Sequence, residues 1–282
     1  MEIEFDEIGI WSEVKLAIIE KYASAYASIM NASRRTIPRL EWLYIDAFAG
    51  PGLHVSRRTG ELVKGSPLIA LDTKPPFHEY HFIDADSNRT NQLQRLAEDH
   101  PHNSDNVHIY SADCNQTLLN DVFPRARFED YKRALCLLDP YNINLRWEVI
   151  ETAGKMKTVD MFLNFMIMDI NRNVLRQNPD AAVQNKREQL TRLWGDESWI
   201  DAAYDSTGNL FGNPEKVSND RFEKAWRARL KEKAGFKFVS EPLPMKTKTN
   251  SVIYYLYFAS QKNVAHDIVR DIFKKYQQQQ GL

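Results

Sequence analysis

The fold is indicated most clearly by the stretch Trp42-Leu43-Tyr44-Ile45-Asp46-Ala47-Phe48-Ala49-Gly50-Pro51-Gly52. Its first part is almost continuously apolar, as is typical of a strand buried on both faces of a parallel sheet. Its second part is a glycine turn, which lets the backbone approach a ligand closely. We therefore expect a central strand that ends at a binding site.

The rest of the chain alternates between strand and helix patterns. Strand patterns recur at 80–83, 106–110, 134–138 and 159–165, and the segments between them contain helical spacings of apolar residues. This alternation predicts a parallel sheet covered by helices on both faces, which is a three-layer Rossmann-like α/β fold. Residues 53–64, after the glycine turn, are predicted to be a polar loop.

The last part of the chain departs from this alternation. Strand patterns are absent from 169–233, where helical patterns dominate, and they return at 236–239 and 252–259. These two late strands are close enough along the chain to pair antiparallel. We therefore expect an α/β core made of residues 1–168 and 236–282, with a helical insert at 169–235.

Composition supports a globular protein and excludes several classes. The 282 residues are 43% hydrophobic, enough for a large core, and a net charge of −1 indicates no partner by itself. Met1 to Ile10 lacks the features of a signal peptide, and no apolar run approaches the roughly 18 residues needed to cross a bilayer. Only two cysteines are present, so we expect Cys114 and Cys136 to be buried thiols in a cytoplasmic protein.

Carboxylates follow four consecutive predicted strands, at Asp46, at Asp84 with Asp86, at Asp113 and at Asp139. Because open parallel sheets bind ligands beyond the carboxyl ends of their strands, these acids are expected at one rim. The glycine turn fails the dinucleotide fingerprint, since the sixth position counted from Gly50 is Val55. A pyrophosphate ligand such as NAD is therefore disfavoured, whereas adenosine with a cationic tail suits this set of residues.

Two short blocks resemble the paired motifs of class I S-adenosylmethionine-dependent methyltransferases, in particular enzymes that methylate amines of nucleic acids. These blocks are Phe48-Ala49-Gly50-Pro51-Gly52 and Asp139-Pro140-Tyr141. Further blocks extend the similarity over nearly the whole chain, namely Trp11 with Lys15, Gly65 to Leu71, Phe82 to Asp86, Asp113 to Asn115 and Tyr254 to Ala259. Their order and spacing resemble the three-Cys-motif partner protein family. The resemblance implies a methyltransferase-type sheet whose last strand is antiparallel.

The resemblance also implies the cofactor S-adenosylmethionine and a set of residues around it. Carried over by position, the residues that border the methionine part are Asp46, Phe48, Gly50 and Gly52, whereas Asp84 would contact the ribose and Asp113 the adenine. Helix capping competes with ligand binding at two of the acids at the rim. For Asp86 we favour the N-cap, and for Asp113 both roles remain open.

In the amine-methylating enzymes that the chain resembles, the aspartate and the proline carbonyl accept hydrogen bonds from the target amine, and the aromatic ring stacks on the base. The resemblance therefore gives catalytic roles to Asp139, Pro140 and Tyr141. This chain departs from the signature after its single proline, because Asn142 follows Tyr141. That departure puts the amine-methylating role in question.

Other polar features admit two interpretations each. Residues 53–64 contain His54, Arg57, Arg58 and Lys64, which suit either a basic lid or a solvated loop. The segment from Pro214 to Lys248 contains ten Lys or Arg residues and five Asp or Glu residues. This excess of basic residues suits either nucleic-acid binding or a solvated helix face. The histidines show no metal-ligand spacing, so we expect no metal site.

The leading hypothesis is an S-adenosylmethionine-dependent methyltransferase whose acceptor is unidentified and includes nucleobase amines among its candidates. The alternative is a non-catalytic partner of a three-cysteine protein similar to radical S-adenosylmethionine enzymes. With two cysteines, this chain would be the partner and not the cluster carrier. No membrane association is expected.

Overall fold

The computed structural model describes residues 6–100, 106–175, 184–205, 215–247 and 249–279. Its centre is an eight-stranded sheet in the order β11-β13-β8-β7-β2-β5-β6, with β12 paired to β13. The parallel part consists of β6 (Val107–Ser111), β5 (Glu79–Asp84), β2 (Glu41–Asp46), β7 (Lys132–Leu138) and β8 (Val159–Phe165). The stretch that decided the predicted fold therefore supplies the central strand, β2.

The remaining strands of this sheet are antiparallel to their neighbours. β13 (Val252–Ser260) pairs with β8 on one side and with β11 (Phe238–Val239) and β12 (Leu243–Lys246) on the other. The predicted mostly parallel sheet with an antiparallel last strand is thus confirmed. β12 was not predicted, because Pro244 weakens its strand pattern. Proline is tolerated there since β12 lies at the edge of the sheet, off its main path.

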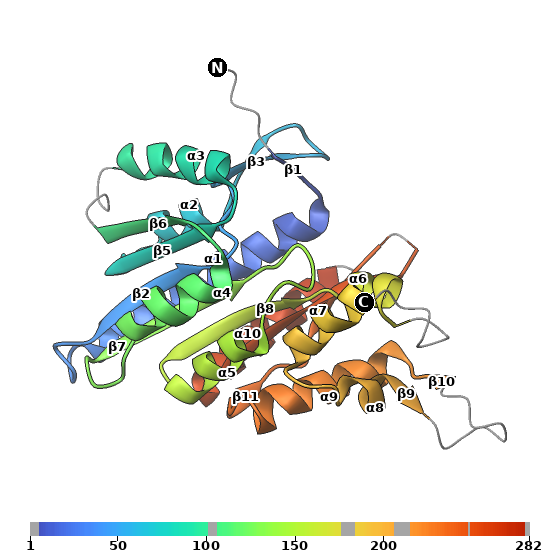
Figure 1. The fold of residues 1–282 in the computed structure, drawn as a ribbon. Coiled ribbons are helices and arrows are strands. Elements are labelled where there is room, and N and C mark those ends of the chain that lie inside the picture. Colours follow the sequence, from blue (N-terminus) through green and yellow to red (C-terminus); the bar gives the residue numbers. More distant parts are fainter. Residues whose placement is uncertain (1–5, 101–105, 176–183, 206–214, 248, 280–282) are drawn as a thin grey trace.

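Helices cover both faces of the sheet (Figure 1). One layer contains α1 (Ile10–Ser33), α2 (Ser66–Asp72) and α10 (Asn263–Gln279), and the other contains α4 (Cys114–Thr117), α5 (Trp147–Met156) and the short turns η2 (Leu118–Val122) and η3 (Phe123–Arg125). α3 (Ser87–Glu98) packs against β5 and β6. Side chains of β2 alternate between the layers, with Trp42 and Tyr44 in one core cluster and Leu43 and Ile45 in the other. Burial on both faces explains the continuous apolar run of this strand.

The helical segment after β8 packs onto the same core as the sheet. Its elements are α6 (Ile167–Asn173), α7 (Gln184–Trp194), α8 (Trp199–Ala203), the short pair β9 (Tyr204–Asp205) and β10 (Glu215–Lys216), and α9 (Asn219–Glu232). Trp226 of α9 is fully buried and stacks on Phe165 of β8 at 4.7 Å between ring centroids. Of the helices in the described ranges, none is both long and apolar enough to cross a membrane.

Residues 53–64 form a hairpin, so the prediction of a polar loop was wrong. β3 (Leu53–Ser56) pairs antiparallel with β4 (Leu62–Lys64) and parallel with β1 (Asp6–Ile8) near the start of the chain. These strands span only three or four residues each, too few to give a clear strand pattern. Gly60, with a φ of +74°, makes the turn between β3 and β4.

Candidate functional site

The carboxyl ends of the parallel strands border two neighbouring cavities. The inner cavity has a volume of about 190 Å³, and its walls include Phe48, Gly50, Asp139, Pro140 and Tyr141. The adjoining cavity has a volume of about 270 Å³, and its walls include Phe48, Asp84, Asp113 and Tyr141. The shared walls Phe48 and Tyr141 make the two cavities neighbours. Asp46 and Gly52, also carried over as site residues, line neither cavity.

The two glycines of the turn have different surroundings. Gly50 has a φ of +65° and lines the inner cavity, and a Cβ at this position would meet only the ring of His54, at 3.8 Å. Gly52 has a φ of +84°, and a Cβ there would lie 2.9 Å from Leu96 and 3.2 Å from Leu93 of α3. Gly50 thus borders the cavity, whereas Gly52 is needed for the packing of α3 against the turn.

Asp84 holds the glycine turn in place from the end of β5. Its carboxylate accepts hydrogen bonds from the backbone N–H groups of Gly50, at 3.0 Å, and Asp86, at 2.9 Å. The residue is 7% exposed and lines the adjoining cavity. A carboxylate has about four lone-pair sites, so Asp84 retains acceptor capacity toward that cavity.

Asp86 and Asp113, for which helix capping competed with ligand binding, both cap helices. Asp86 accepts a hydrogen bond from the backbone N–H of Asn88 at 2.9 Å, which confirms the N-cap of α3. Asp113 accepts one from the backbone N–H of Gln116 at 3.1 Å at the start of α4. Both also line the adjoining cavity, together with Cys114. Cys114 and Cys136 are buried free thiols, as predicted, and burial raises the pKa of Cys114 to about 12.

Asp46 is a fully buried carboxyl at the end of β2. Its Oδ1 accepts a hydrogen bond from the N–H of Phe48 at 3.3 Å, and its Oδ2 has no donor among the described residues. Burial raises the pKa of Asp46 to about 7, and the nearby carboxylate of Asp139 acts in the same direction, whereas the hydroxyl of Ser66 favours the ionised form. A buried acceptor without a donor is costly, which favours the protonated form of this carboxyl.

Asp139 already has donors on both of its oxygens. The ammonium of Lys15 on α1 pairs with Oδ2, and the amide of Asn164 on β8 donates to Oδ1. Lys15 is 7% exposed, and all three residues line the inner cavity. Lys15 was part of the family resemblance but was given no site role, and Asn164 was not singled out. An amide in the apolar run of β8 was the signal that could have identified Asn164.

Tyr141 stands at the mouth of both cavities and is 63% exposed. Arg89 of α3 donates to its hydroxyl at 3.2 Å, lies 5.2 Å from its ring centroid, and pairs with Asp6 of β1 at 3.0 Å. A third hollow of about 480 Å³ continues outward from Tyr141 and is lined also by His54, Arg57 and Arg89. Arg89 was not predicted as a site residue. The hairpin of residues 53–64 thus forms a wall of the entrance.

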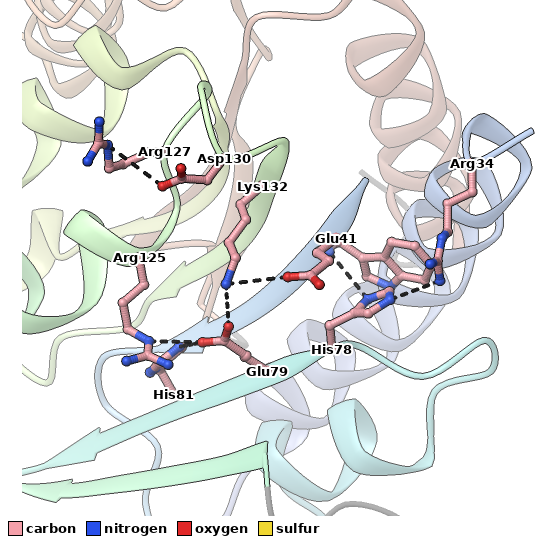
Figure 2. A network of polar contacts seen from close by, with 10 residues as sticks. Arg34, Glu41, His78, Glu79, His81, Arg125, Arg127, Asp130 and Lys132 are labelled. Atoms are coloured by element: carbon pink, nitrogen blue, oxygen red, sulfur yellow. Dashed lines mark hydrogen bonds and ion pairs between the residues drawn. The ribbon is translucent and has the colours of Figure 1, made fainter. Parts of the chain in front are cut away.

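A second polar cluster lies around the start of β5 (Figure 2). His81 and His108 are register partners on β5 and β6, with ring centroids 4.9 Å apart, and their ligand atoms lie within 4.8 Å of a carboxylate oxygen of Glu79. The sequence had given no sign of this grouping, and His102 lies outside the described residues. Arg125 and Lys132 donate to the two oxygens of Glu79 at 2.9 and 2.5 Å. Two bonded cations disfavour the addition of a metal ion.

Comparisons with known proteins leave the family open. No protein-family model and no curated protein matches the chain. A Legionella pneumophila protein of the DUF519 family model matches with 10% identity and a TM-score of 0.48, over 95% of this chain and 91% of that one. The methyltransferase domain of a bacterial protein named CtHen1 matches with 12% identity and a TM-score of 0.39, over 85% and 99%. With values this low, neither likeness says what the chain binds, and membership of the three-Cys-motif partner family stays a prediction.

Proposed function

We propose that this chain is an S-adenosylmethionine-dependent methyltransferase whose cofactor binds in the inner and adjoining cavities. The observation that supports this most is that acids at the ends of consecutive strands surround the two neighbouring cavities. Asp84 and Asp113 line the adjoining cavity, and Asp139 lines the inner cavity. The glycine turn that follows β2 lacks the fingerprint of a pyrophosphate-binding loop, which disfavours a dinucleotide.

The polar atoms around the inner cavity suit a ligand with a cationic amino group. Asn164 lines this cavity, and its buried Oδ1 has no donor among the described residues. The carboxylate of Asp139 lines the same cavity. The α-ammonium of S-adenosylmethionine would supply a donor and a positive charge for such acceptors. In the adjoining cavity, Asp84 would accept hydrogen bonds from the ribose hydroxyls, and Asp113 would contact the adenine while it caps α4.

When bound, S-adenosylmethionine supplies a methyl group on a positively charged sulfur, and the residues of the chain position the acceptor. Lys15 and Asn164 fix the carboxylate of Asp139 at the edge of the inner cavity. Asp139 and the carbonyl of Pro140 would accept hydrogen bonds from a nucleobase amine and stabilise the positive charge that develops on its nitrogen. The exposed ring of Tyr141 offers a face on which a planar base can stack.

One observation favours the alternative of a non-catalytic partner of a three-cysteine protein. Both oxygens of Asp139 already accept from Lys15 and Asn164, so an acceptor amine must share this carboxylate with an ammonium and an amide. A fold that kept its cofactor cavity but had lost methyl transfer would tolerate such an arrangement. This alternative predicts cofactor binding without turnover.

Calorimetry and methyl labelling together test the proposal. We expect saturable binding of S-adenosylmethionine and none of NAD. Tritiated methyl groups should enter nucleic acid or a component of cell extract, measured with and without a co-expressed three-cysteine protein. Binding without labelling under both conditions would support the non-catalytic alternative, and binding of NAD alone would contradict both.

Substitutions at Asp139 identify its role. Asp139→Ala should leave the affinity for S-adenosylmethionine nearly intact while turnover falls by roughly 100-fold. Asp139→Asn, which keeps the side-chain volume, serves as a second variant if the alanine variant unfolds. Asp86→Asn is the matched control at the same rim, because asparagine and aspartate cap helices equally well. Equal turnover of the wild-type and Asp139 variants would assign Asp139 a structural role only.

A further inference from the structure

A separate cavity of about 200 Å³ lies beside the amino ends of β7 and β8, opposite the cofactor cavities. We call it the amino-edge cavity. Its walls come from the second half of α1, the first residues of β7 and β8, and the turn that follows β13. None of its lining residues also lines the inner or the adjoining cavity. Because β7 and β8 point their carboxyl ends at the cofactor cavities, this amino-edge cavity is a distinct place in the fold.

Three polar atoms of the lining residues have no hydrogen-bond partner among the described residues. They are the hydroxyls of Tyr26 and Thr158 and the Oε1 of Gln261. Tyr26 is 3% exposed and Thr158 is 4% exposed. Gln261 donates through Nε2 to the carbonyls of Gly154 and Gly235 at 3.1 and 2.8 Å, which fixes the amide orientation. Buried polar atoms left without partners are destabilising, so a ligand that satisfies them would be favoured.

The charges around the amino-edge cavity favour an anion. Arg133, Lys157 and Lys262 are lining residues, against the single carboxylate of Asp160. Both oxygens of Asp160 already accept hydrogen bonds, from Tyr22 at 2.7 Å and Ser260 at 2.6 Å. The lining cations therefore outnumber the lining carboxylates, and a ligand with a negative group would restore the balance.

Arg133 is the cation best placed to recognise such a group. Its guanidinium donates to the carbonyl of Lys132 at 2.7 Å and lies 4.3 Å from the ring centroid of Phe128. No ion pair joins Arg133 to a carboxylate in the described part of the chain. Burial lowers the pKa of Arg133, which agrees with a partly desolvated cation. A planar guanidinium matches a carboxylate in two parallel hydrogen bonds.

We propose that the amino-edge cavity binds a small organic carboxylate with a compact apolar body. The carboxylate would contact Arg133 and the hydroxyls of Tyr26 and Thr158, and the apolar body would lie against Met30 and the neighbouring aliphatic side chains of the lining. An apolar cavity of about 150 Å³ is known to hold benzene, so this volume suits a ligand of benzoate size. The inference is independent of the proposed methyl transfer.

Benzoate and its neutral analogue benzamide test this inference by ligand-observed NMR and calorimetry on the full chain. We expect saturable binding of benzoate in the millimolar range or tighter, and binding of benzamide at least roughly tenfold weaker. Arg133→Gln should weaken benzoate binding by roughly tenfold or more. Thr158→Val, which keeps the shape of the side chain, should weaken it by less.

One control and one further variant place the binding at this cavity. Asp84→Asn at the carboxyl rim should bind benzoate like the wild-type chain. Tyr26→Phe should stay folded because it only removes an unpaired hydroxyl, and it should weaken benzoate binding because that hydroxyl is a proposed contact of the carboxylate. Absence of saturable benzoate binding would overturn the inference. Equal binding of benzoate and benzamide, or unchanged benzoate binding by folded Arg133→Gln protein, would overturn it as well.

Discussion

Replacing Asp84 by asparagine tests the link between the end of β5, the glycine turn and the cofactor. The carboxylate accepts from the N–H groups of Gly50 at 3.0 Å and Asp86 at 2.9 Å. Asparagine keeps one acceptor oxygen, so one of these N–H groups would lose its acceptor. Hydrogen bonds to charged groups contribute about 1.5–3 kcal/mol, and a buried group left without a partner costs about 1–3 kcal/mol. We expect the free energy of unfolding to fall by roughly 1–3 kcal/mol.

Cofactor affinity should fall by a comparable amount if Asp84 also accepts from the ribose. Loss of one charge-assisted hydrogen bond corresponds to a roughly 10- to 100-fold rise in the Kd for S-adenosylmethionine. Calorimetry would measure this, with thermal melting as the check on folding. Asp86→Asn, two residues away and still able to cap α3, should change the Kd by less than about threefold.

A pair of nucleosides makes the experiment specific for the ribose. Adenosine should bind the wild-type chain more tightly than 2′,3′-dideoxyadenosine does, and this difference should shrink in Asp84→Asn protein. A folded Asp84→Asn protein that keeps both the wild-type Kd and the wild-type nucleoside preference would refute the assignment of Asp84 to the ribose.

Three further predictions concern acid stability, a buried charge and the core. The ring of His81, 3.3 Å away, and the hydrogen-bonded side chains of Lys132 and Arg125 hold the pKa of Glu79 well below its usual value of 4.5. The stabilising effect of this carboxylate is therefore present above about pH 4.5 and is lost as the pH falls. Glu79→Gln should therefore unfold more easily at neutral pH, by ~1–2 kcal/mol after allowance for solvent screening, and acid titration of unfolding should show a flatter profile. Burial raises the pKa of Asp46 from 3.8 to about 7, so its ionisation costs stability as the pH rises through this range. In urea unfolding, the free energy of unfolding of Asp46→Asn should thus exceed that of the wild-type chain by ~1–3 kcal/mol above pH 7 and by little near pH 4. An equal difference at both pH values would contradict this. Trp226 lies in the core that the helical segment shares with the sheet, so Trp226→Ala should lower the free energy of unfolding by ~3–5 kcal/mol and still unfold in a single urea transition. Two separate transitions would show that the helical segment and the sheet unfold independently.

Local sequence patterns predicted much of the fold because they express the geometry of a few neighbouring residues. The apolar run of β2 and the alternation of strands and helices predicted the layered sheet, and the helix caps at Asp86 and Asp113 follow from residue type and spacing. Short strands were not predicted in this way. β3 and β4 span four and three residues, too few for a clear strand pattern, and β12 contains a proline.

The positions of acids and glycines at the ends of the parallel strands could be read from the sequence, because strand ends and turns are encoded within a few residues. The contacts among these groups depend on how the whole chain packs. Lys15 and Asp139 are 124 positions apart, and Asn164 comes from a different strand. His81 and His108 likewise become neighbours only through the register of β5 and β6. Strand order and register arise from packing over the whole chain, so no local pattern could have shown that the carboxylate of Asp139 is already bonded to an ammonium.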